Sequence, residues 1–151
     1  MSKVSPVPKG FHTLTPHIVV RDSAAAIDFY KRAFAATEIS RTQMGKGGPI
    51  LHAEVRIGDS ILMLNDEMEG QSAPKGPSPV TLSLYVADAD ATFASATKAG
   101  AKPVMPLANM PWGDRYGVVV DPYGHSWAIA TRIEDVPAEE LKKRLAAMAP
   151  R

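Results

Sequence analysis

Two histidines and a glutamate stand where they could act together on a small molecule. His52 and Glu54 alternate with apolar residues in the stretch 50–57, so they share one face of a predicted strand with Arg56. His17 lies in an earlier predicted strand, residues 14–21. Two imidazoles and a carboxylate are donors that a divalent metal accepts, and without a metal His52 could serve as a general base. The same side chains could instead be plain polar lining of a pocket, with His52 and Glu54 bonded to Arg56.

A second group of candidates surrounds the loop 110–113. Trp112 is followed closely by Asp114 and Arg115, and an aromatic ring beside an acid and a base suits a pocket rim that stacks on and orients a ligand. The alternative is an Asp–Arg pair on the surface, with Trp112 buried in the core. By the two-residue period, Thr15 shares a face with His17, and Ser83 shares one with Tyr85. We therefore expect the ligand-binding residues to be Thr15, His17, Arg56, Ser83, Tyr85, Trp112, Asp114, Arg115 and Tyr116, with His52 and Glu54 as the catalytic residues of any reaction.

These residues are positioned by a sequence that repeats after 66 residues. Gly124 falls on Gly58 (124 − 58 = 66), Asp88 on Asp22, and Val118 on His52. We expect each half to run strand, helix, and three further strands. The expected modules are residues 14–65 and 80–131, joined by a linker rich in proline and glycine, 66–79, and followed by a helix over 137–148. Because neither half holds enough apolar residues to fold alone, we expect residues 1–151 to form a single domain.

Composition limits the classes of function. The chain has 151 residues, a formal net charge of +1 and 22% charged residues, so it has no basic surplus for nucleic acid or an anionic membrane. It has no cysteine, which excludes disulfides, thiolate metal sites and a cysteine nucleophile. The first eleven residues carry no apolar stretch of the length of a signal peptide, and no segment reaches membrane-spanning length. We therefore expect a cytoplasmic protein.

Two tandem β-α-β-β-β modules, with a turn of the form D-P-x-G at residues 121–124, resemble the vicinal oxygen chelate superfamily. This superfamily includes glyoxalase I, bleomycin-resistance proteins, fosfomycin-resistance transferases and extradiol dioxygenases. The match to its PhnB-like branch rests on the segments 24–34, 52–66, 82–90, 112–117 and 121–136. The resemblance implies an α+β fold in which eight strands form a curved mixed sheet, a cup, with the helices outside. It also implies a homodimer, and open sheet edges support that expectation.

The resemblance further implies four metal ligands, which this sequence lacks. The first strands of the two modules place Thr15 and Thr81 at the ligand positions. The last strands place Leu62 or Met63 in module one, and Ala128 or Ile129 in module two. None of these is a good donor for a transition metal. We therefore expect no cofactor, with a divalent metal held by His17, His52 and Glu54 as the alternative.

Two functions follow from these observations. The first is a protein that binds a small molecule in the cup, without the metal and without nucleic-acid or membrane partners. The second is an enzyme, a lyase, isomerase or dioxygenase, that uses His52, Glu54 and His17. The identity of the ligand has no signal in the sequence.

Overall fold

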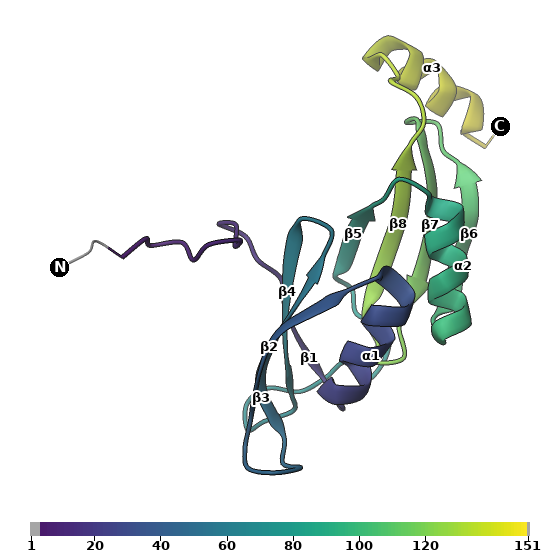
Figure 1. Ribbon diagram of the computed structural model, residues 1–151. Helices are drawn as coiled ribbons and strands as arrows, with labels where there is room; N and C mark the ends of the chain where they lie inside the picture. Colours follow the sequence, from purple (N-terminus) through teal and green to yellow (C-terminus); the bar gives the residue numbers. More distant parts are fainter. Residues whose placement is uncertain (1–3, 151) are drawn as a thin grey trace. The chain divides into compact units, whose positions relative to one another are not determined.

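The computed structural model describes residues 4–150, which divide into two compact units. Unit 1 comprises residues 4–76 together with the turn 122–124, and unit 2 comprises the rest. Each unit holds one four-stranded mixed sheet and a helix that follows its first strand (Figure 1). The predicted β-α-β-β-β modules are therefore confirmed, with their eight strands arranged as two separate four-stranded sheets.

Unit 1 has strand order β1-β4-β3-β2, in which the first strand runs parallel to the last. In the middle of β3 the side chains alternate between the two faces of the sheet. Ala53 and Val55 lie fully buried on the face that carries α1, and Ile27 of that helix is buried with them. Complete burial of an aliphatic side chain contributes about 1.5–3 kcal/mol, so this face forms the core of the unit. The elements are β1 His17–Val20, α1 Ser23–Phe34, β2 Thr37–Gln43, β3 Ile50–Ile57 and β4 Ser60–Asp66.

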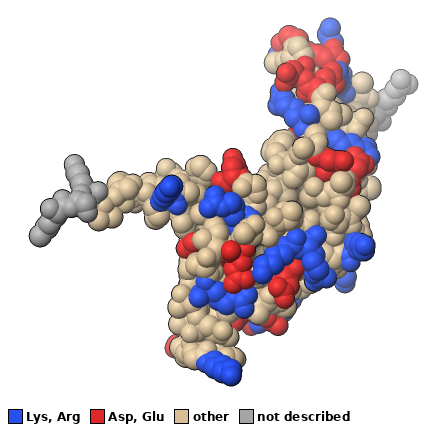
Figure 2. Space-filling view, in the orientation of Figure 1, with Lys and Arg blue, Asp and Glu red and all other residues tan. Residues whose placement is uncertain are grey.

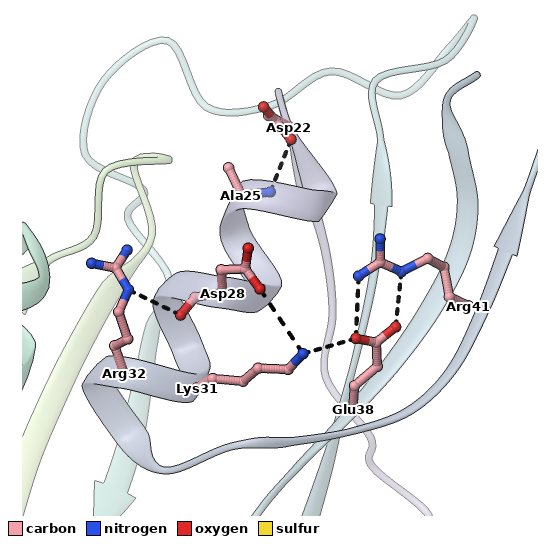
Figure 3. Close-up of polar contacts among 7 residues, drawn as sticks. All are labelled: Asp22, Ala25, Asp28, Lys31, Arg32, Glu38 and Arg41. Atoms are coloured by element: carbon pink, nitrogen blue, oxygen red, sulfur yellow. Dashed lines mark hydrogen bonds and ion pairs between the residues drawn. The ribbon is translucent and has the colours of Figure 1, made fainter. Parts of the chain in front are cut away.

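Helix α1 begins and ends with local signals that the sequence carries. Asp22 caps it, since its side chain accepts a hydrogen bond from the Ala25 amide at 2.9 Å (Figure 3). Beyond its last turn, Lys31 and Arg41 both bond the carboxylate of Glu38, at 3.0 and 2.8 Å. The bond from Arg41 is the main reason that the pKa of Glu38 lies below its ordinary value. These contacts join the helix to the edge strand β2.

Unit 2 repeats the arrangement with strand order β5-β8-β7-β6. Val119 and Ile129 are fully buried on the face that carries α2. Gly117 lies under the same helix, because a Cβ there would come within 2.9 Å of the Phe93 ring. The edge strand β6 contains two prolines, which an edge tolerates because one side of it has no partner strand. The elements are β5 Thr81–Tyr85, α2 Ala89–Ala99, β6 Lys102–Asn109, β7 Asp114–Val120, β8 Ser126–Arg132 and α3 Ala138–Met148.

The turn between β7 and β8 is fixed by Asp121. Its carboxylate accepts hydrogen bonds from the His125 amide at 2.9 Å and from the Trp127 indole at 3.0 Å. Trp127 is in register with Val119 and is buried on the helix side of the sheet. His125 in the turn is buried as well.

The repeat between the modules is not free of gaps. Across the sheet of unit 1, His17 pairs with Met63 and Met63 with Glu54. The matching row of unit 2 is Ser83, Ala128 and Val118, which gives offsets of 66, 65 and 64 (83 − 17, 128 − 63, 118 − 54). Val118 thus corresponds to Glu54 rather than to His52. The reason is loop length: β2 and β3 are joined by residues 44–49, whereas β6 and β7 are joined by the shorter loop 110–113, which lowers the offset from 66 to 64. The longer loop 121–125 between β7 and β8, compared with residues 58–59 between β3 and β4, then raises it to 65.

Helix α3 follows β8 through an extended segment of unit 2. It carries both acidic and basic side chains (Figure 2), with glutamates first and lysines and an arginine after them, and Arg144 bonds both Glu134 and Glu140. Glutamates in its first turn suit the positive end of the helix dipole. Within residues 4–150, no helix combines the length and the apolar character needed to cross a membrane.

Candidate functional site

The candidate residues occupy the inner face of each sheet, the face opposite the helix, in two separate clusters. Unit 1 contributes a polar cluster from β1, β3 and β4. Unit 2 contributes an aromatic cluster from β5, β7 and the loop before β7. Each cluster is described within its own unit.

In unit 2 a buried carboxylate holds two aromatic side chains. Asp114 is 3% exposed, and its Oδ2 accepts hydrogen bonds from the Tyr85 hydroxyl at 2.9 Å and from the Trp112 indole N–H at 3.0 Å. Tyr85 and Trp112 keep 63% and 40% of their surface exposed. Tyr116, two residues along β7, meets the Trp112 ring edge to face at 5.5 Å. The three rings form an exposed platform over one fixed anion, which we call the aromatic platform.

The charge on Asp114 changes the pKa of its neighbour Tyr85. The bond to Asp114 is the largest cause of a raised pKa at Tyr85, because the carboxylate favours the neutral hydroxyl that donates to it. Among the described residues, Oδ1 of Asp114 has no hydrogen-bond partner. Arg132, its register partner on β8, bonds Asp135 instead. The hydrogen bonds to the carboxylate come from two side chains of the aromatic platform, while Arg132 contributes its charge without a bond.

The loop that carries Trp112 is held on both sides. Gly113 donates to the Met110 carbonyl at 3.0 Å and accepts from the Glu134 amide at 3.0 Å. Its φ of 100° suits glycine, and a Cβ at this position would overlap the Glu134 carbonyl. The segment after β8 therefore fixes the loop and, through it, the direction of Trp112.

Several expected members of this cluster lie elsewhere. Arg115 follows Asp114 in the strand and so points to the opposite face, where it bonds Asp90 of α2 at 2.8 and 3.1 Å. The expected Asp–Arg pair does not form. Ser83 does share the inner face with Tyr85, at an exposed position in the middle of β5. Because Trp112 is 40% exposed, the core alternative for this ring does not hold.

In unit 1 the two histidines and the glutamate are brought together as expected. The rings of His17 and His52 lie 5.8 Å apart and perpendicular, and Nε2 of His52 is 3.2 Å from the Glu54 carboxylate. Arg56 shares their strand face, is exposed, and forms no bond with Glu54. Thr15 lies before β1, where its hydroxyl closes a turn with the His12 backbone at 2.8 Å, so it does not join the cluster.

One residue of this cluster was missed in the sequence analysis. Asn65 is 1% exposed on β4, and its Oδ1 lies 2.6 Å from Nε2 of His17. The available signal was the strand period, since Asn65 falls two residues after inward-facing Met63.

Neither cluster fits a metal. The residues 4–150 contain no group of three or more His, Cys, Asp or Glu side chains that could hold an ion. At the last-strand ligand positions, Met63 and Ala128 face inward, whereas Leu62 and Ile129 face the helices. A thioether and a methyl group do not replace a carboxylate or an imidazole there.

Comparison with known proteins agrees with this architecture. The profile of the Glyoxalase/Bleomycin resistance protein/Dioxygenase superfamily matches residues 10–129. The chain belongs to this superfamily. An uncharacterized protein of Mycobacterium bovis is 43% identical over 136 residues, covering 85% of this chain and 89% of its own length.

Solved structures of the superfamily share the fold. TioX from Micromonospora sp. ML1 is 30% identical with a TM-score of 0.65, and the match covers 81% of this chain and 99% of TioX. The fosfomycin resistance protein FosX from Mesorhizobium loti is 16% identical with a TM-score of 0.62, covering 89% and 97% of the two chains. At that identity the likeness to FosX concerns the fold alone.

Proposed function

We propose that this superfamily member is a small-molecule-binding protein whose ligand stacks on the aromatic platform, and that it binds without the metal used by many relatives. The observation that carries the proposal is the shared bond of Tyr85 and Trp112 to buried Asp114. Two exposed rings are held in place before any ligand arrives, so little side-chain freedom is left to lose on binding. A planar aromatic compound is the class of ligand that such rings favour.

The test is a saturation-transfer NMR screen against one- and two-ring aromatic fragments, each paired with its fully saturated analogue. We expect the aromatic members to bind and their saturated partners not to bind. Trp112→Ala and Tyr116→Ala should abolish the signals, while Lys98→Ala, which changes an exposed side chain of α2 in the same unit, should leave them unchanged. Equal signals from the saturated analogues, or binding that survives Trp112→Ala, would contradict the proposal.

The names of the superfamily and of one similar structure include two antibiotics, bleomycin and fosfomycin, which can be added to the same screen. Bleomycin carries a planar bithiazole, whereas fosfomycin has no aromatic ring. Stacking on Trp112 therefore favours a ligand of the bleomycin kind over one of the fosfomycin kind. Fosfomycin binding that is independent of Trp112 would place the ligand site elsewhere in the chain.

A catalytic function is the second candidate, and the contact of His52 with Glu54 favours it. A carboxylate 3.2 Å from the imidazole can compensate the positive charge that His52 gains when it takes a proton from a ligand. If the protein turns over a small molecule, His52→Ala and Glu54→Gln should both abolish turnover. Turnover that is unaffected by His52→Ala would exclude this role.

We also propose a cytoplasmic homodimer of the PhnB-like branch. Edge strand β6 supports dimer formation, because Val104 and Met105 are exposed on it at 59% and 42%. Exposed apolar edges are normally paired or covered. Sedimentation velocity at micromolar concentration should give a dimer, and a monomer would refute this assembly.

A further inference from the structure

A chain of hydrogen bonds in unit 1 runs from the segment after β4 to His17. The side-chain amide of Asn65 donates to the Asp66 carbonyl at 2.7 Å and to Oε1 of Gln71 at 2.9 Å. Its Oδ1 lies 2.6 Å from Nε2 of His17. Asn65 is buried, so its three contacts account for both amide hydrogens and for the oxygen.

These hydrogen bonds determine which ring nitrogen of His17 carries the hydrogen. The Asp66 carbonyl can only accept, so the nitrogen of the Asn65 amide must face it and the oxygen must face His17. An amide oxygen can only accept as well, so Nε2 of His17 must be the donor. The neutral ring therefore has its hydrogen on Nε2 and a lone pair on Nδ1.

His52 also donates through Nε2, but its acceptor is a carboxylate rather than an amide. Nε2 of His52 faces the Glu54 carboxylate at 3.2 Å, and a carboxylate accepts, so His52 also donates through Nε2. Among the described residues neither Nδ1 has a hydrogen-bond partner. The two rings meet edge to face with their centroids 5.8 Å apart, so the two imidazoles are direct neighbours in unit 1.

We infer that this pair of imidazoles is a binding site for a ligand group that donates hydrogen bonds, such as a hydroxyl or an amide N–H. In its neutral form His17 accepts through Nδ1, because Nε2 donates to Asn65. His52 is an acceptor whose partner, Glu54, can compensate a positive charge. Asn65 and Gln71 are positioning residues that set the tautomer and orientation of His17. The site is independent of the aromatic platform, which lies in the other unit.

The first test measures the tautomer directly. Long-range ¹H–¹⁵N NMR of the neutral rings should show His17 entirely as the Nε2–H form. Asn65→Leu should give a mixture of the two forms, whereas Asn109→Leu, on β6 of unit 2, should leave His17 unchanged. Gln71→Met changes an exposed side chain and keeps the fold intact, and it should produce the same mixture to a smaller extent. A wild-type His17 with its hydrogen on Nδ1, or a mixture in the wild type, would overturn the inference.

The second test measures binding with phenol and with anisole, its methyl ether. The two differ only in the hydroxyl hydrogen. At mildly alkaline pH, where imidazole is neutral, phenol should shift the ring resonances of His17 and His52, and anisole should not. Loss of one orienting hydrogen bond weakens binding by about two- to tenfold, which is the loss expected in Asn65→Leu. Equal shifts from anisole, or phenol-induced shifts of His52 that are unchanged in His17→Ala, would overturn the site while leaving stacking on the platform untouched.

Discussion

Replacing Tyr85 by phenylalanine tests whether the bond to Asp114 holds the aromatic platform. The acceptor is a buried carboxylate at 2.9 Å, and hydrogen bonds to charged groups contribute about 1.5–3 kcal/mol to stability. Tyr85 is 63% exposed, so solvent competes for its hydroxyl and the lower part of that range applies. We expect Tyr85→Phe to lower the free energy of unfolding by about 1–2 kcal/mol.

The same change made in an Asp114→Leu background isolates the bond. Leucine removes a buried, half-paired charge together with its two bonds, and these effects largely cancel, so Asp114→Leu alone should stay within about 1 kcal/mol of wild type. In that background Tyr85→Phe should cost almost nothing. Urea unfolding of the four proteins gives the coupling energy. If Tyr85→Phe lowered the free energy of unfolding equally in both backgrounds, the bond to Asp114 would not be what holds Tyr85 in place.

Three further outcomes follow from the geometry. Because the pKa of Tyr85 is raised in the folded state, its contribution to stability is complete below the pH at which an unfolded tyrosine ionises, and it is lost as pH rises through the folded pKa. Asp114→Asn should bring the pKa of Tyr85, measured by ultraviolet absorbance, back toward that of free tyrosine. The pKa of Glu38 is lowered, so its contribution to stability is present above the ordinary pKa of 4.5 and is lost as pH falls through the lower folded pKa. Glu38→Gln should therefore reduce the pH dependence of stability in that acid range. An unchanged pH profile of stability would contradict this role of Glu38. Gly113→Ala should destabilise by about 1–3 kcal/mol, because the added methyl group overlaps the Glu134 backbone, and a melting temperature equal to wild type would contradict the loop geometry.

Metal content is a separate prediction. Protein purified without added metal should hold no stoichiometric zinc, nickel, iron or manganese, and a chelator should leave its melting temperature unchanged. An ion that binds only the folded state would stabilise it by mass action. A clear drop in melting temperature with EDTA would reveal a site, and alanine variants of His17, His52 and Glu54 would locate it.

Local patterns in the sequence predicted most of the elements. Alternation in 50–57 gave strand β3 with its correct bounds, and Asp22 and Asp88 cap the two helices as expected. These features depend on neighbouring residues, so a single sequence contains them. The same alternation could have separated Asp114 from Arg115, since consecutive strand residues cannot share a face.

Contacts between distant residues had no such signal. The bond from Asn65 to Gln71 depends on the path of the segment after β4, and the position of Trp112 depends on backbone bonds from residues after β8. The gap in the repeat was hidden because both hairpins contain a glycine, Gly58 and Gly124, that aligned at 66 residues although the loops differ in length.

The most direct test of the platform is the affinity of a stacking fragment for wild type and for Asp114→Leu, measured by tryptophan fluorescence. Asp114 is buried, so it offers no contact area to a ligand, but it holds Tyr85 and Trp112 in place. Releasing two side chains costs about 0.5–1.5 kcal/mol each on binding, so Asp114→Leu should weaken the fragment by about 5- to 150-fold. An affinity equal to wild type would show that Tyr85 and Trp112 need no fixed anion, and would contradict the proposed origin of binding.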